Sequence, residues 1–235
     1  DSIWKGMIGA KKITGNDISL VAKRYDWTSG TVYTQYDDRA NNVFDDGTKF
    51  YVITDDYNVY KCLFNNYGAT STVKPSYTSV NTVSVESDGY IWKYLYTLNT
   101  RDRNRFLNTE FMPVKHLTAD DGSLQWGVQS NAVDGSIDVV LIENAGAGYS
   151  NASNLTITFY GDGNGAAANV TLNSTYQNVQ TITMTTRGGG YTFANVRLSG
   201  GGSSSRTGSQ LANARAIMSP FGGHGSDPVY ELGAS

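Results

Sequence analysis

The chain has 235 residues, with 18 basic and 21 acidic side chains and a formal net charge of −3. This balance excludes a polycation that binds nucleic acid or an anionic membrane through its overall charge. Sixteen tyrosines, 26 glycines and many Thr, Ser, Asn and Val residues favour strands and turns over helices. No apolar run approaches the ~20 residues of a membrane-spanning helix. The composition predicts a mainly β protein with few short helices and neither nucleic acid nor membrane as a partner.

The N-terminal part shows no charged stretch followed by an apolar one, so no signal peptide is evident, and we expect the chain to be a piece of a longer protein. NDISLVAKRYDW (16–27) predicts a short helix that is capped by Asn16 or Asp17. TKFYVITDD (48–56) and NVYKCLF (58–64) predict two strands joined by a hairpin turn, because aromatic and β-branched residues flank a polar Asp-Asp-Tyr sequence.

After a polar loop at 65–82, DGYIWKYLYTL (88–98) is almost entirely aromatic, β-branched or apolar. A strand buried on both faces has this composition, so we expect the centre of the core here. With the preceding strand it forms a core motif of Tyr60, Cys62, Leu63, Gly89, Tyr90, Trp92 and Tyr94. Cys62 is the single cysteine of the chain, and we expect a buried apolar side chain; a nucleophilic thiol is the alternative.

NTRDRNRF (99–106) predicts a charged turn or one helical turn. Its three arginines could meet an acidic partner or a phosphate backbone, but the acidic total favours a solvated turn or a protein interface. TEFMPVKHL (109–117) is extended in pattern, and Pro113 indicates a sheet edge or a strand end. Residues 119–136 form a polar bridge that contains Trp126. We therefore expect an internal boundary at this bridge.

Beyond the bridge, short β-type runs alternate with glycine clusters and carry little charge. SIDVVLIENAGAGYS (136–150) aligns with NVQTITMTTRGGGYT (178–192), at an offset of 42 residues. In both segments a strand pattern leads to a Gly-x-Gly-Tyr turn, a second strand, a glycine-rich turn and a third strand. The structural turns of this repeat are Gly146, Gly148, Tyr149, Gly188, Gly190 and Tyr191. We expect two copies of one β-unit, with both tyrosines buried at equivalent positions.

A Gly-x-Gly sequence can also belong to a phosphate-binding loop, in which backbone N–H groups and a helix N-terminus approach the anion. No helical pattern and no Lys-Ser/Thr pair follows either copy. Glycine also supplies the positive φ angles that tight turns require. The structural turn is therefore the favoured interpretation, and a ligand loop is the alternative.

Four adjacent aspartate pairs occur, at residues 37–38, 45–46, 55–56 and 120–121. Such pairs could bind Ca²⁺ or act in glycoside hydrolysis, but none has calcium-loop spacing, so solvated turns are favoured. His116 and His224 are far apart, and neither has a second ligand at metal-binding spacing. We expect His224 to bond a nearby backbone group in a turn. No catalytic residue, metal ligand or cofactor-binding residue is expected.

Five stretches follow one another along the chain: DSIWKGMIGAKKI, KRYDW, VYKCLF, SDGYIWKYLYTL and FMPV. This order is similar to that of the baseplate wedge protein 8 family of T4-like contractile-tailed bacteriophages. The closing GGHGSDPVYELGA resembles the form that this family takes in cyanophages. The resemblance covers about residues 1–117 and 217–235, and its most specific piece is VYKCLF followed by DGYIWKYLY.

Members of that family are β-rich structural proteins of the virion that dimerise within each wedge and contact other wedge subunits. The resemblance implies a non-enzymatic protein of the tail baseplate, assembled in the host cytoplasm, with no cofactor and no small-molecule substrate. It also implies a β-sandwich-like core, formed here by 1–118 and 217–235. The glycine-rich β-repeat domain at 119–216 departs from the T4 form of the family, and we expect it to be an insertion between the two parts of the core. The family pattern continues past ELGA, which again indicates a piece of a longer chain.

Two other classes of protein stay open. A carbohydrate-binding or adhesin-type β-domain would display clustered, exposed aromatic residues such as Trp92, Trp126 or Tyr149. Burial of Trp92 and Tyr149 would count against that class. A hydrolase that uses an aspartate pair would place two carboxyl groups from different strands across a cleft about 5–10 Å wide.

Overall fold

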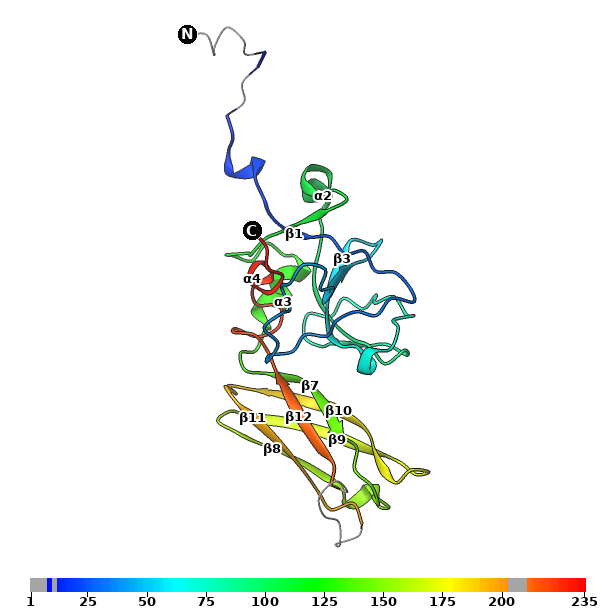
Figure 1. The fold of residues 1–235 in the computed structure, drawn as a ribbon. Coiled ribbons are helices and arrows are strands. Elements are labelled where there is room, and N and C mark those ends of the chain that lie inside the picture. Colours follow the sequence, from blue (N-terminus) through cyan, green and yellow to red (C-terminus); the bar gives the residue numbers. More distant parts are fainter. Residues whose placement is uncertain (1–7, 10–11, 203–210) are drawn as a thin grey trace.

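The computed structural model describes residues 8–9, 12–202 and 211–235, and the first stretch of the family resemblance lies largely outside them. The described chain is mainly β, as predicted (Figure 1). Its strands are β1 (Leu20–Lys23), β2 (Tyr51–Ile53), β3 (Asn58–Phe64), β4 (Ser84–Val85), β5 (Ile91–Thr97), β6 (Phe111–Val114), β7 (Ile137–Asn144), β8 (Thr156–Gly161), β9 (Asn164–Asn173), β10 (Asn178–Gly189), β11 (Ala194–Ser199) and β12 (Asn213–Met218). Its helices are α2 (Thr100–Phe106), α3 (Leu124–Ser130) and α4 (Pro228–Glu231), with single 3-10 turns η1 (Gly15–Asp17), η2 (Asn66–Gly68) and η3 (Ala152–Asn154).

The strands form two lobes, which are stacked one above the other in Figure 1. The core lobe holds β1–β6 and the three α-helices. Its strands make an antiparallel sheet in the order β2-β3-β5-β4 and a separate β1-β6 pair. The repeat lobe holds β7–β12, paired as β7 with β12, β8 with β11, and β9 with β10. Among the described residues, each strand ladder therefore stays within one lobe.

Strands β3 and β5 lie at the centre of the four-stranded sheet and are buried on both faces, as predicted for 88–98. On one face Cys62 and Trp92 pack in an aromatic cluster, and on the other Val59 and Leu95 face a second cluster. All four side chains are fully buried, so the prediction that Cys62 is a buried apolar residue is confirmed. The hairpin between β2 and β3 is also confirmed.

The helix predicted at 16–27 is wrong, because β1 occupies this stretch and pairs with β6. The pairing places Ala22 opposite Met112, and both side chains are buried in the core. Burial of this kind outweighs a weak helix propensity, which is worth only a few tenths of a kcal/mol per residue. Pro113 lies in β6, in a sheet of two strands, where its missing N–H is tolerated.

The polar bridge predicted at 119–136 contains helix α3. Ser123 caps this helix, and its hydroxyl accepts a backbone N–H at 3.3 Å. Val128 is then buried in the aromatic cluster of β5. The helix has only seven residues and a central glycine, so its periodicity is too weak to read from sequence. Part of the block predicted at 119–216 thus packs with the core lobe, and the repeat-lobe strands run over 137–218.

The two predicted β-units occupy equivalent positions in the repeat lobe. Strand β7 pairs with β12 in the same manner as β10 pairs with β9, and each pairing skips two residues as β-bulges. The skipped residues are Asp138 and Glu143 in β7, and Gln180 and Thr185 in β10. Both bulges thus recur at the 42-residue offset of the repeat. Strands β8 and β11 pair with each other. Because the first strand of each unit pairs with the third strand of the other, an approximate two-fold axis relates the two units.

Tyr149 and Tyr191 are 2% and 5% exposed, and each reaches into the other unit. The Tyr149 hydroxyl accepts the N–H of Ala212 at 2.9 Å, and the Tyr191 hydroxyl accepts that of Ala166 at 3.5 Å. The strand registers make the two alanines equivalent positions at the start of the third strand of each unit. The tyrosines therefore join the two units reciprocally.

The two lobes contact each other through an apolar patch and an ion-pair cluster. Leu63 of β3 packs with Val139 of β7 and Ile217 of β12. Beside this patch, Arg215 Nη1 of β12 lies 3.0 Å from Asp37 Oδ1 and 3.2 Å from Asp38 Oδ1. The Arg215 side chain is 14% exposed, so these ion pairs are partly shielded from water. The repeat lobe is thus attached to the core lobe by both apolar and charged contacts.

Candidate functional site

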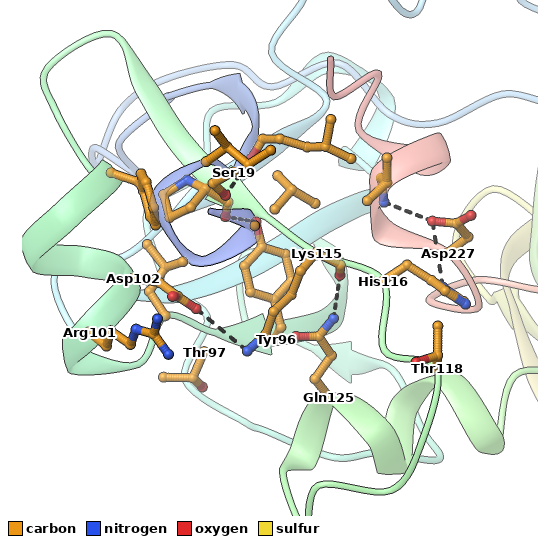
Figure 2. A pocket seen from close by; sticks show the side chains of 18 residues that line it. Ser19, Tyr96, Thr97, Arg101, Asp102, Lys115, His116, Thr118, Gln125 and Asp227 are labelled. Atoms are coloured by element: carbon orange, nitrogen blue, oxygen red, sulfur yellow. Dashed lines mark hydrogen bonds and ion pairs between the residues drawn. The ribbon is translucent and has the colours of Figure 1, made fainter. Parts of the chain in front are cut away.

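A cavity of about 740 Å³ opens in the core lobe beside helix α2 (Figure 2). This volume lies within the range of small-molecule pockets. The lining residues are Gly15, Ile18, Ser19, Leu20, Tyr96, Thr97, Leu98, Arg101, Asp102, Phe106, Pro113, Val114, Lys115, His116, Thr118, Gln125, Asp227 and Val229. Segments from both ends of the chain therefore meet here, and the wall mixes apolar side chains with charged ones.

Helix α2 supplies Arg101 and Asp102 to one side of this cavity. Asn99 caps the helix: its side-chain oxygen accepts the Asp102 N–H at 2.8 Å, and its amide donates to the Asp102 carboxylate at 2.7 Å. Lys115 Nζ lies 3.5 Å from the same carboxylate. Arg101 makes no ion pair with any residue that the structure describes. Residues 99–106 were predicted to form a charged turn or one helical turn. The capped helix α2 shows that the helical alternative is correct.

The opposite side of the cavity carries His116 and Asp227, as Figure 2 shows. Their Nδ1 and Oδ1 atoms are 3.8 Å apart, and His116 Nδ1 is also 3.1 Å from Gln129 Nε2. Asp227 caps α4, where its carboxylate accepts the N–H of Val229 at 3.0 Å. Both carboxylates that line the cavity are thus held by other protein groups.

A second group of ionisable side chains lies inside the core lobe. Lys61 Nζ is 2.8 Å from Glu231 Oε2, and the two side chains are 1% and 0% exposed. The N–H of Gly225 donates to the other carboxylate oxygen at 2.6 Å. Burial alone would raise the pKa of Glu231, but Lys61 lowers it to about 2. His224 was predicted to bond a backbone group; it lies instead with Nδ1 3.8 Å from Glu231 and its ring edge-on to Tyr36.

Lys93 lies directly opposite Lys61 in the β3–β5 register and is also buried. Its amine donates to the Val80 carbonyl at 3.2 Å. Burial is the main cause that lowers the pKa of Lys93 to about 8. A lowered pKa is common in catalytic lysines, but Lys93 is only 2% exposed and does not line the cavity beside α2. Neither lysine was predicted to be buried, although a charged residue within a run that is buried on both faces indicates a buried charge.

Three aspartate pairs lie in exposed turns, as predicted: 45–46, 55–56 and 120–121. In the fourth pair Asp38 also lies in an exposed turn, but Asp37 is partly buried, and both carboxylates bind Arg215. Within the described ranges, no group of three His, Cys, Asp or Glu side chains is arranged to hold a metal ion. The carboxylates therefore join segments of the chain and form no candidate metal centre there.

The four glycines of the two Gly-x-Gly-Tyr sequences all have positive φ, between 60° and 74°, and Gly188 lies near the end of β10 while the other three follow the strands: Gly146, Gly148, Gly188 and Gly190. The N–H of Tyr149 donates to Gln177 at 2.7 Å, and the N–H of Tyr191 donates to Gly135 at 3.2 Å, again at the repeat offset. Strands β8 and β11 follow the two turns, where a phosphate loop would require an α-helix. The geometry supports structural turns. The last glycine-rich turn lies mostly outside the described residues.

The aromatic residues expected at a carbohydrate site are mainly buried. Trp92 is 0% exposed and Tyr149 is 2% exposed, while Trp126 in α3 is half-buried. A sugar-binding platform requires exposed rings. The burial of Trp92 and Tyr149 therefore counts against the carbohydrate-binding alternative in the form in which it was predicted.

Comparisons with models of protein families, with curated proteins and with solved structures found no match. Within the part of the chain that the structure describes, none of the helices has the length and apolar character needed to cross a membrane.

Proposed function

We propose that this chain is a structural subunit of the baseplate wedge of a contractile phage tail. It holds neighbouring wedge proteins together through protein–protein contacts, as a homodimer within the virion, and requires no cofactor, substrate or catalytic residue. The ordered resemblance to the wedge family supports this proposal. Its two most specific stretches, VYKCLF and DGYIWKYLY, fall on β3 and β5, which are neighbouring strands at the centre of the core sheet.

The observation that carries the proposal is that charged side chains form ion pairs between distant segments of the chain. Lys61 binds Glu231 across 170 residues of sequence, and Arg215 binds Asp37 across 178 residues. These groups join distant segments of the chain in partly or fully buried positions. Breaking such a pair leaves an uncompensated buried charge, which is strongly destabilising. A chain that uses its charges in this way is suited to a rigid scaffold.

Large apolar side chains also remain on the surface of both lobes. Phe221 is 87% exposed, Tyr176 is 72% exposed and Tyr230 is 65% exposed. Aromatic side chains bury a large area with few rotatable bonds, and they are enriched at the centres of protein interfaces. These residues supply contact area for neighbouring subunits.

Immunogold labelling tests the proposal. An antibody raised against the purified chain is applied to phage particles whose genome encodes this sequence, with antibody pre-absorbed on the same protein as the control. We expect gold at the baseplate end of the tail. Label on the capsid, or absence of the chain from purified particles, would reject the baseplate role.

One observation favours a second candidate, a carbohydrate-binding β-domain. Tyr160 and Phe193 are 51% and 56% exposed, and the β8–β11 register makes them diagonal neighbours on the outer face of the repeat lobe. Two exposed rings at this spacing can stack on a sugar. Glycan-array binding that is lost in both Tyr160→Ala and Phe193→Ala would support this candidate, and an array without binding would reject it.

A further inference from the structure

The cavity in Figure 2 has an exposed apolar wall. Ile18 and Leu20 expose 65% and 47% of their surfaces. They alternate along an extended segment, so both side chains point to the same side. Phe106 and Val229 add partly buried apolar surface to the lining. This wall can receive apolar side chains from outside the molecule.

Positive charge lies beside that wall and is only partly neutralised. Arg101 and Lys115 each carry one positive charge, and Asp102 supplies one negative charge, 3.5 Å from Lys115. Arg101 has no ion-pair partner among the described residues. In Figure 2 these three side chains form one group, and His116 with Asp227 forms another. One positive charge is therefore available to a group that enters the cavity.

Hydroxyl groups also line the cavity. Ser19 and Thr118 contribute hydroxyls to the lining, whereas the Thr97 hydroxyl is already bonded to Tyr94 and Asn58. A hydroxyl can both donate and accept a hydrogen bond, so it can pair with either group of a peptide backbone. The lining therefore offers partners to each part of a short peptide: its backbone, its apolar side chains and a carboxylate.

We propose that this cavity receives an extended segment of a neighbouring protein in which a Glu or Asp residue is flanked by apolar residues. The carboxylate meets Arg101, and the apolar side chains pack on Ile18 and Leu20. Complementary charge of this kind selects an acidic segment over a basic one. The inference rests on the proposed function, since a subunit that holds its neighbours needs a recess for them.

Peptide titration followed by nuclear magnetic resonance tests this docking site. The isotope-labelled chain is titrated with acetyl-Leu-Glu-Leu-amide and with the matched Gln and Lys peptides. We expect the Glu peptide to shift the signals of residues 18–20, 101–106 and 115–118. It should bind about three- to fivefold more tightly than the Gln peptide, which is the range of an exposed ion pair. The Lys peptide should bind most weakly.

Three variants identify the groups that act in this titration. Arg101→Gln should remove the preference for Glu over Gln, and Ile18→Ser should weaken both peptides alike. Arg197→Gln, which changes an exposed arginine of the repeat lobe, should leave both affinities unchanged. Equal binding of the Glu, Gln and Lys peptides, or shifts confined to other residues, would overturn the proposal.

Sedimentation equilibrium tests a second copy of this chain as the occupant. We expect Arg101→Gln to leave the oligomeric state unchanged. Dissociation of a dimer by this substitution would place a second copy in the cavity and overturn the proposal. The docking site and the baseplate role can be rejected independently. A titration without binding would reject the docking site and leave the immunogold result unaffected. Particles without gold label would reject the baseplate role even if the peptide binds.

Discussion

Lys61 and Glu231 lie 170 residues apart in sequence, and their side chains form a 2.8 Å ion pair that is almost completely buried. The pair joins the central strand β3 to helix α4. Leu232, the next residue, packs in the same core. The C-terminal segment is therefore an integral part of the core lobe, and its attachment depends on two charges that have both lost their contact with water.

Removing one partner of this pair should destabilise the protein strongly. We expect Lys61→Met to lower the free energy of unfolding by about 3–5 kcal/mol, because Glu231 would remain charged and buried. Urea unfolding followed by circular dichroism measures the change. Lys74→Met, which breaks the exposed ion pairs with Asp55 and Asp56, is the matched control and should cost less than about 1 kcal/mol. Equal effects of the two substitutions would contradict the assignment.

The same pair predicts a loss of stability in acid. The folded-state pKa of Glu231 is lowered to about 2 from an ordinary value of 4.5. Its contribution to stability is therefore fully present above pH 4.5 and is lost as the pH falls from there towards 2. We expect the stability difference between the wild type and Glu231→Gln to shrink over this interval. A difference that stays constant from pH 6 to pH 3 would show that Glu231 does not titrate in this way.

Lys93 predicts the opposite behaviour at alkaline pH. Its pKa falls to about 8 in the folded state from 10.5, so below pH 8 the fold carries a buried charge. Between pH 8 and 10.5 the unfolded chain binds more protons, and stability should rise with pH. We expect Lys93→Met to be about 1–2 kcal/mol more stable at pH 7 and to lack this rise. Urea unfolding at pH 7, 9 and 10 compares the two proteins, and parallel pH profiles would refute the prediction.

The close packing of the repeat turns predicts a steric effect at Gly163. A Cβ at this position would lie 2.4 Å from Cγ of the buried Tyr191 ring and 2.5 Å from its backbone nitrogen. We expect Gly163→Ala to cost about 1–3 kcal/mol of stability through overpacking. Gly15→Ala is the control, since its Cβ would meet nothing within 4 Å. Thermal unfolding measures both, and a Gly163→Ala protein as stable as the control would contradict the packing.

The ion pairs of Arg215 with Asp37 and Asp38 should strengthen the attachment between the two lobes. Its hydrogen bonds to Asp37 and Asp38 are charge-assisted. Each bond of this kind contributes about 1.5–3 kcal/mol to the free energy of unfolding. We expect Arg215→Gln to speed amide hydrogen exchange at Leu63 and Val139, which lie at the lobe contact. Exchange inside the repeat lobe, at Val179 for example, should change less. Uniform acceleration over both lobes would indicate global unfolding instead.

Local sequence patterns predicted the strands that are buried on both faces and the repeated β-units. The run at 88–98 has few polar residues, so only a fully buried strand suits it. The Gly-x-Gly-Tyr turns were readable because positive φ favours glycine and because the pattern occurs twice. These features depend on residues that are close in sequence, and the structure bears them out.

Features that depend on distant residues were not readable. The stretch 16–27 suits a short helix or a strand, and only its pairing with β6 decides between them. The partner of Lys61 lies in a helix of four residues near the end of the chain, and no local pattern connects the two. Asp37 and Asp38 were assigned to solvent for the same reason, because Arg215 is 177 residues from Asp38. The cavity likewise combines residues from both ends of the chain.

The most direct test of the central claim is an electron-microscopy map of the assembled phage tail. If the chain is a wedge subunit, the two-lobed fold should match density in every wedge of the baseplate, with protein neighbours on its surface. A baseplate whose density is fully accounted for by other proteins, or this fold located elsewhere in the particle, would contradict the account.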